Sequence, residues 1–183
     1  MMNVSYKASL AACIAAVTLG WAATASADSA TGSLTVQVNL VDDCKVSSSD
    51  GNSPFGGAFL NFGTQGTLTD VVDGRTEASG NGALLVQCTK GVAYSVGLGA
   101  GTNPGTPGDV NTRRMGNAGE YVTYQLYSDS GRATVWGDQV GQNTVQRTST
   151  GQVEAIPVYG RIPPQTTPRR GLYTDIVSII LTY

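Results

Sequence analysis

Histidine is absent from this sequence, and charged residues of either sign are scarce. Lys and Arg number 11 and Asp and Glu 13, so only 13% of the 183 residues are charged. Soluble domains usually carry roughly 25%. Without an imidazole there is no Ser-His-Asp or Cys-His relay and no His-ligated metal. A formal net charge of −2 supplies no basic surface for a phosphate backbone. The composition therefore argues against an enzyme and against a nucleic-acid partner.

The carboxylates and glycines also form no recognisable catalytic or cofactor motif. Asp42 and Asp43 are adjacent, so on a strand they point to opposite faces and cannot act as a pair. Asp70 and Asp73-Gly74 are typical of turns. No GxSxG, SxxK, Walker or GxGxxG pattern is present. We expect no catalytic residue, no metal and no cofactor.

Glycine, in contrast, is abundant at 24 residues, and apolar residues alternate with polar ones instead of following a helical period. The clearest alternation places Leu34, Val36, Val38 and Leu40 on one face of an expected strand. Many short strands joined by turn-forming connectors predict an antiparallel sandwich or barrel. Strands are expected over 34–40, 83–88, 93–98, 120–127, 133–136, 153–160 and 173–183, and connectors over 47–57, 99–108, 137–151 and 163–171.

The N-terminus has the pattern of a cleaved export signal. Lys7 precedes an uncharged, mostly apolar stretch over 8–23, and Ala25-Ser26-Ala27 gives the small-x-small pattern for cleavage before Asp28. A transmembrane anchor is disfavoured because a bilayer span needs about 20 strongly apolar residues. Removal of residues 1–27 would leave 156 residues, which is one domain by length.

Two cysteines remain after that cleavage, because Cys13 leaves with the signal. Cys44 and Cys88 form an even pair in an oxidising compartment, which favours a structural disulfide. No CxxC spacing and no histidine support a zinc site or an activated thiol.

The strands expected at the two ends of the mature chain could pair in two ways. The final strand carries Val177, Ile179, Leu181 and Tyr183 on one face, and Ile176 and Ile180 add apolar residues to the other face. This pattern predicts a central strand buried on both faces, yet no further strand follows it. The N-terminal strand could pair with it in the same chain. Alternatively, it could fill the groove of a neighbouring subunit, and such head-to-tail contacts would generate an open fibre.

Three blocks of residues resemble a known family in order and spacing. The blocks are Asn81–Leu98, then Arg114-Met115 with Tyr121–Asp129 and Trp136–Asp138, and finally Val158–Arg161 with Gly171–Tyr183. Together they resemble the spore coat U domain family, which includes the pilins of archaic, Csu-type chaperone–usher pili. The resemblance covers nearly the whole chain after residue 27.

This resemblance implies an incomplete immunoglobulin-like antiparallel β-sandwich that lacks its last strand. A periplasmic chaperone would lend a strand to the open groove, and the outer-membrane usher would exchange it for the N-terminal extension of an identical or related subunit. The implied divisions are a signal peptide over 1–27, a donor-strand extension over 28–40 and the sandwich domain over 41–183.

The resemblance also implies roles for particular residues. Leu34, Val36, Val38 and Leu40 match the apolar residues of the donor strand. Val177, Ile179, Leu181 and Tyr183 match the final strand that borders the groove and binds the chaperone, and the apolar doublet Ile179-Ile180 leaves the groove-facing parity open. Cys44 and Cys88 match a disulfide between the first two strands of the domain.

The implied function is a structural shaft subunit of a pilus, exported through the periplasm to the cell surface, where it supports attachment and biofilm formation. The alternative is a secreted, self-complemented coat or glycan-binding module. We interpret Arg113-Arg114 and Arg169-Arg170 as solvated loop charges, not as a site for an acidic glycan. Trp136 is expected in the core and not as a sugar-stacking platform.

Overall fold

The computed structural model describes residues 28–47, 58–76 and 82–183, and regular structure there is β apart from one short 3₁₀ helix, η1 (Val110–Thr112). The expected all-β class is confirmed. The expected signal over 1–27 and most of the connector over 47–57 lie outside the described residues. In chain order the strands are β1 (Cys44–Ser47), β2 (Val72–Arg75), β3 (Leu85–Cys88), β4 (Ala93–Leu98), β5 (Arg114–Asn117), β6 (Glu120–Thr123), β7 (Gln125–Tyr127), β8 (Val145–Thr148), β9 (Glu154–Ala155), β10 (Tyr159–Ile162) and β11 (Ile179–Thr182).

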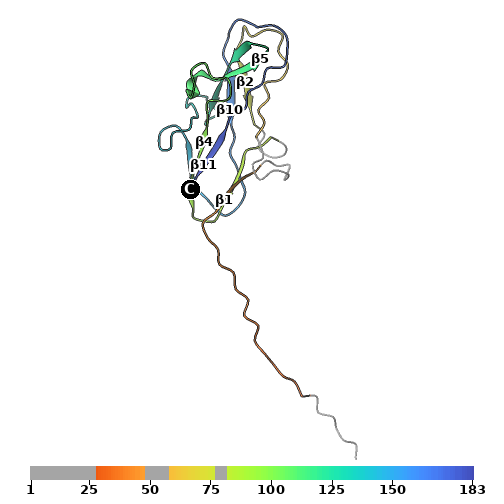
Figure 1. Ribbon diagram of the computed structural model, residues 1–183, viewed down its shortest axis with the longest axis vertical. Coiled ribbons are helices and arrows are strands. Elements are labelled where there is room, and N and C mark those ends of the chain that lie inside the picture. The colour runs from red at the N-terminus through yellow and green to blue at the C-terminus, as the bar shows by residue number, and fades with distance from the viewer. Residues whose placement is uncertain (1–27, 48–57, 77–81) are drawn as a thin grey trace, which may run out of the picture. The chain divides into compact units, whose positions relative to one another are not determined.

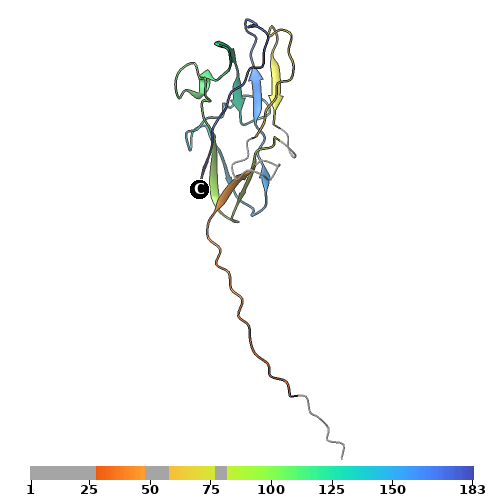
Figure 2. The ribbon, with the colours of Figure 1, turned by 45° about the vertical axis from the view of Figure 1, so that its right-hand side comes forward.

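The strands pair in small antiparallel sheets. Three sheets have three strands each, in the orders β1-β3-β9, β2-β10-β7 and β11-β4-β8, and β5 and β6 form a separate hairpin. Figure 1 shows β11 beside β4, and Figure 2 shows the yellow β2 beside the blue β10. None of the described residues belongs to a helix with the length and hydropathy that a bilayer span requires.

Strand β4 follows its sequence pattern without a shift in boundaries. Alternation over 93–98 predicts a strand with the bounds that the structure has. It begins after a turn in which the Val92 amide donates to the Thr89 carbonyl at 3.2 Å. Gly91 has a φ of +89° at the third position, as a type II turn requires, and this conformation favours glycine.

Side chains from the three larger sheets meet in one apolar core. Trp136 is fully buried there, and its indole Nε1 donates to the Val96 carbonyl at 2.8 Å. The expectation that Trp136 is a core residue is therefore confirmed. Its buried neighbours are Leu68, Leu84, Val86, Cys88, Val92, Tyr94, Val96, Leu98, Val122, Tyr124, Leu126, Ile156, Val158 and Ile162.

Several elements differ from the sequence expectations. Residues 34–40 form no strand, and over 133–136 only an isolated bridge between Val135 and Tyr127 is present. Strand β8 lies inside the expected connector over 137–151. It has one apolar side chain, Val145, and its pairing with β4 is a backbone contact that periodicity does not report. Asp73 lies within β2, not in a turn, and accepts two hydrogen bonds from Arg161 at 2.7 and 2.9 Å.

The final strand is an edge strand. β11 pairs with β4 along one side, and its side chains alternate between half-buried and exposed. The expectation of a central strand buried on both faces is wrong, because Ile176 is 75% exposed and Ile180 is 40% exposed.

Arg113 is the largest departure from the sequence interpretation. It is fully buried, and its guanidinium donates to the carbonyls of Leu98, Gly99 and Trp136 at 2.6, 2.9 and 2.8 Å. A fourth hydrogen bond goes to Gln125 Oε1 at 2.7 Å. Burial lowers the pKa of Arg113, but an arginine remains protonated in proteins. This charge therefore joins the end of β4 to two loop carbonyls and is not solvated.

The other three arginines of the two Arg-Arg pairs are less buried than Arg113. Arg114 is half-buried and donates to the carbonyls of Asn103 and Pro104 at 3.1 and 3.0 Å, so it too has a structural role. Arg170 is exposed, in agreement with the interpretation of a solvated charge. Arg169 is also exposed, but it forms an ion pair with Glu120 at 2.8 Å.

We expect Arg113→Ala to lower the free energy of unfolding by about 3–5 kcal/mol, because buried carbonyls lose their donor and a large cavity is left. Urea denaturation followed by tryptophan fluorescence measures this loss. The exposed Arg170→Ala is the matched control, with an expected change within about 0.5 kcal/mol. Equal midpoints for the two variants would contradict the proposed role of Arg113.

Candidate functional site: an open apolar groove

A largely apolar groove opens along one side of the core. This groove of about 730 Å³ runs between two segments of chain, 58–68 and 167–177, and core side chains form its floor. An apolar cavity of about 150 Å³ holds one benzene molecule, so this groove is large enough for several aliphatic side chains. The floor residues are Leu84, Leu98, Val122, Tyr124, Leu126, Val158 and Ile162.

The first wall, residues 58–68, packs against two glycines. Leu60 and Phe62 point inward, and they cover Gly74 in β2 and Gly160 in β10, which lie opposite each other in register. A Cβ on Gly160 would be 2.7 Å from the Phe62 ring and 3.0 Å from Leu60, so only glycine leaves room. The backbone is tied at Phe59, whose amide donates to the Gly82 carbonyl at 3.0 Å.

The second wall, residues 167–177, is tied to the domain by hydrogen bonds near its end. The Asp175 carboxylate accepts from the Thr102 amide and hydroxyl at 2.8 and 2.7 Å, and from the Tyr124 hydroxyl at 2.7 Å. Just after the wall, the Ser178 carbonyl accepts from the Gly99 amide at 3.0 Å. Burial raises the pKa of Tyr124, and the adjacent Asp175 carboxylate raises it further, so the phenol remains a donor.

One edge of β11 is open. The strand pairs with β4, and no other strand among the described residues pairs with its opposite edge. An unpaired edge next to an apolar groove provides backbone donors and acceptors together with a hydrophobic surface. This combination suits an added strand better than a small molecule.

The residues expected to border the groove occupy different places. Val177 and Ile179 line it, and Leu181 is half-buried against the core. Tyr183 is 59% exposed and is not part of the lining. Odd positions from 173 to 181 therefore face the core, which settles the parity that the doublet Ile179-Ile180 left open.

The groove also contains residues that sequence reasoning missed. They are Asp175, Tyr124, Leu60 and Phe62. In the structure half-buried and exposed residues alternate over 58–62, but the sequence there does not alternate, because Phe59 is apolar as well, so periodicity gives no signal. Nothing in the sequence alone placed Tyr124 next to Asp175.

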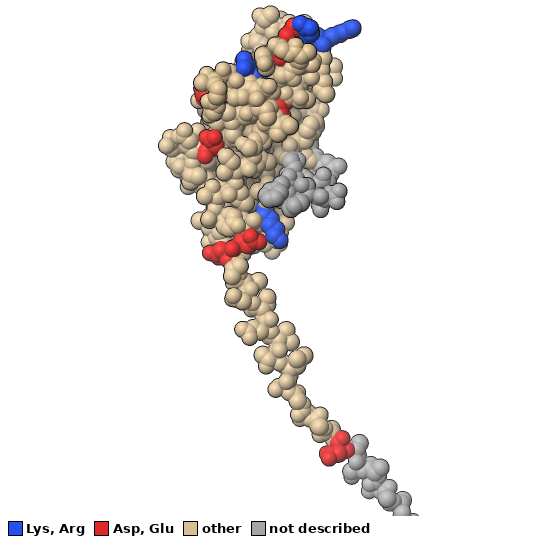
Figure 3. Space-filling view, viewed as in Figure 1, with Lys and Arg blue, Asp and Glu red and all other residues tan. Residues whose placement is uncertain are grey.

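The residues expected in the donor strand are exposed and extended. Leu34, Val36, Val38 and Leu40 are 79–88% exposed, and residues 28–43 form no strand. No charged residue occurs between Asp28 and Asp42. Figure 3 shows how few Lys, Arg, Asp and Glu side chains lie on the visible face of the molecule. These four exposed aliphatic side chains at alternate positions form an apolar stripe.

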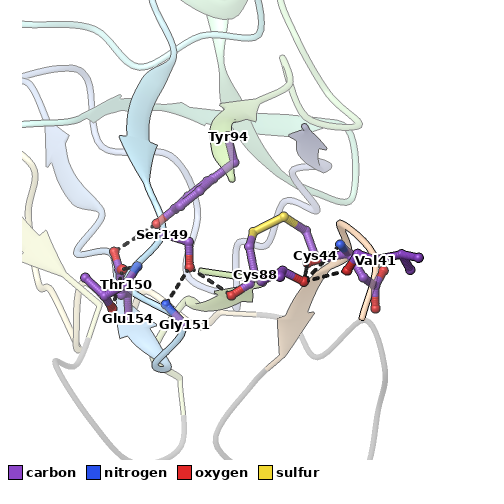
Figure 4. The surroundings of a disulfide bond; sticks show 10 residues. Val41, Cys44, Cys88, Tyr94, Ser149, Thr150, Gly151 and Glu154 are labelled. Carbon is purple, nitrogen blue, oxygen red and sulfur yellow. Dashed lines mark hydrogen bonds between the residues drawn. A yellow bond between two sulfur atoms is a disulfide. The ribbon is translucent and has the colours of Figure 1, made fainter. Parts of the chain in front are cut away.

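The disulfide fixes the start of the domain. Cys44 in β1 and Cys88 in β3 lie opposite each other in register and are bonded (Figure 4). Thr89 adds two hydrogen bonds, from its hydroxyl to the Val41 carbonyl and from its amide to the Asp43 carbonyl, both at 2.9 Å. The bridge joins neighbouring strands of one sheet, although β2 lies between them in the chain.

A polar cluster lies near the disulfide. The Tyr94 hydroxyl donates to Glu154 Oε2 at 3.0 Å (Figure 4). Burial, followed by this carboxylate, raises the pKa of Tyr94 to about 12. Among the described residues no three Cys, Asp or Glu side chains gather as metal ligands would. Glu154 Oε1 also accepts from the Thr150 amide at 3.2 Å and from the Thr150 hydroxyl at 3.1 Å, so the carboxylate has hydrogen bonds to both oxygens.

Comparisons with known proteins agree with this architecture. Residues 30–180 match the model of the Spore Coat Protein U domain family, and the chain belongs to this family. It is 33% identical over 181 residues to Protein U of Myxococcus xanthus, and the match covers 97% of this chain and 98% of that protein. The family expected from the sequence is confirmed.

A solved structure shows the same fold. It is a chain from the CsuC–CsuE chaperone–tip adhesion subunit pre-assembly complex of the archaic chaperone–usher Csu pili of Acinetobacter baumannii. The TM-score is 0.50 at 17% sequence identity, and the match covers 79% of this chain. This chain spans 40% of the length of that solved chain.

We expect removal of the disulfide by Cys44→Ser with Cys88→Ser to cost about 4 kcal/mol, because a loop of about 45 residues is no longer closed in the unfolded chain. Urea denaturation with and without reductant measures the cost. Reductant should lower the wild-type midpoint and leave the double variant unchanged. A wild-type midpoint that ignores complete reduction would contradict the role of this bridge.

Proposed function

We propose that this protein is a structural subunit of a chaperone–usher pilus, and that its groove receives the segment 28–40 of a second copy. The observation that carries the proposal is the apolar groove beside the unpaired edge of β11. A domain with this opening needs an extended apolar strand to complete it.

The chemistry of residues 28–40 supports this choice of occupant. The segment is free of charge after Asp28, and its apolar side chains recur every second residue, which is the period of a strand. Burying four such side chains at ~1.5–3 kcal/mol each amounts to about 6–12 kcal/mol before the entropy of ordering the segment. A ladder of backbone hydrogen bonds to β11 adds to this.

The proposed export and assembly steps both depend on what occupies the groove. An unoccupied groove is an aggregation hazard, so a periplasmic chaperone is the expected first occupant, and an outer-membrane usher would then exchange it for the next subunit. The fold of the chain from the chaperone–adhesion subunit complex supports this proposal. Because the contact is head-to-tail, it leads to an open fibre at the cell surface, where attachment and biofilm formation are the proposed roles.

A second candidate is a secreted coat module whose own segment 28–40 fills its groove. The family description, Spore Coat Protein U domain, favours this candidate. The two candidates differ in assembly, because the coat module would be a stable monomer and the pilus subunit a polymer.

The direct test places charge on the apolar stripe in the native host. The double variant Val36→Asp with Val38→Asp should abolish surface fibres, because two carboxylates cannot enter an apolar groove. Gln37→Asp with Asn39→Asp adds the same charge to the opposite face of the segment and is the matched control, with fibres retained. Electron microscopy and immunoblots of sheared surface material measure the outcome.

Normal fibres from the Val36→Asp, Val38→Asp variant would overturn the proposal. A wild-type protein that is exported, folded and monomeric, with no fibre in either strain, would favour the self-complemented coat module instead.

A further inference from the structure

We propose that Tyr124 sets the width of the groove and thereby restricts the inserted strand to aliphatic side chains at that point. This inference rests on the proposed function and identifies a specificity-determining residue for it. Its basis is that one buried side chain on the groove floor contacts both walls.

The two contacts of Tyr124 are of different kinds. Its hydroxyl donates to Asp175 Oδ2 at 2.7 Å, which links it to the second wall. Its ring meets the ring of Phe62 in the first wall edge to face, with centroids 6.3 Å apart and an interplanar angle of 64°. Tyr124 itself is only 5% exposed and lines the groove. The side chain therefore acts as a spacer between the walls.

The partner in the second wall is itself held in place. Asp175 is fixed by Thr102 through two hydrogen bonds, and a Cβ on Gly101 would collide with its carboxylate. Gly101 has a φ of +85°, a conformation that favours glycine. Thr102 and Gly101 thus hold the carboxylate of Asp175 in one position.

The partner in the first wall is equally constrained. Phe62 lies against Gly160 and Gly74 with no space beneath it. The ring cannot move toward the two glycines because no space is left there, and a movement away from them would lose the contact. With both partners fixed, the walls cannot separate easily at Tyr124.

A groove of fixed width selects by size. Adding atoms to a filled apolar space forces strain in the surrounding side chains, and binding weakens. The segment 28–40 contains Leu and Val but no aromatic residue. The expected partner is therefore an extended segment of aliphatic side chains, as in a second copy of this chain.

The test uses the full-length chain carrying Val36→Asp and Val38→Asp as an acceptor, so that its own segment does not compete. The acceptor is refolded with an equimolar mixture of the peptide 28–43 and its four single variants Leu34→Phe, Val36→Phe, Val38→Phe and Leu40→Phe. Mass spectrometry of the bound fraction gives the ratios of peptides. These ratios do not depend on the yield of folded acceptor.

We expect at least one Phe peptide to be bound about tenfold less than the natural peptide. Adding Tyr124→Phe to the acceptor removes the hydrogen bond to Asp175 and should reduce this discrimination to about threefold or less. Tyr121→Phe is the matched control, because Tyr121 stacks on Arg114 outside the groove and the ratio should stay the same. Should the Tyr124→Phe acceptor fail to refold, Phe62→Leu releases the opposite wall and carries the same expectation.

Two outcomes separate the inference from the proposed function. If the natural peptide is bound but no Phe peptide is rejected, or if the Tyr124→Phe and Tyr121→Phe acceptors give equal ratios, the role of Tyr124 is overturned and the groove remains a strand-binding site. If the natural peptide is not bound by the acceptor at all, the proposed function is overturned, and the role of Tyr124 with it.

Discussion

An apolar groove opens along one side of the hydrophobic core, and the other main features depend on that opening. The buried residues Leu84, Leu98 and Val122 form the floor of this groove, and three further apolar residues that line it are exposed: Phe59 (66%), Leu172 (81%) and Ile176 (75%). Contiguous exposed apolar surface favours association, so the opening creates a need for an occupant. The exposed aliphatic stripe over 34–40 has the complementary chemistry.

The groove keeps its shape because hydrogen bonds to buried residues hold its second wall in place. The buried Arg113 joins the carbonyls of Leu98, Gly99 and Trp136, and so holds the turn that precedes Gly101 and Thr102. Thr102 in turn holds Asp175 through two hydrogen bonds, and Asp175 fixes the second wall. A preformed groove loses little entropy when a strand enters, and most of the ordering cost then falls on the entering segment.

Sequence patterns predicted the parts of the fold that depend on local periodicity. Strand β4 and the buried Trp136 follow from alternation and composition. Alternation also places Val177 and Ile179 on one face, but the structure was needed to show that this face lines the groove. The burial of Arg113 could not be predicted, because it depends on carbonyls that only the tertiary structure gathers. The wall over 58–68 was missed for a similar reason, since its side chains are accommodated by two glycines far away in the chain.

Hydrogen exchange by mass spectrometry on intact fibres tests the central claim most directly. The account predicts that residues 34–40 and those amides of residues 175–182 that do not bond β4 become protected together in fibres, and that both sets exchange rapidly in the unassembled chain carrying Val36→Asp and Val38→Asp. Rapid exchange of residues 34–40 within intact fibres would contradict the account, because the segment would then lie outside any sheet.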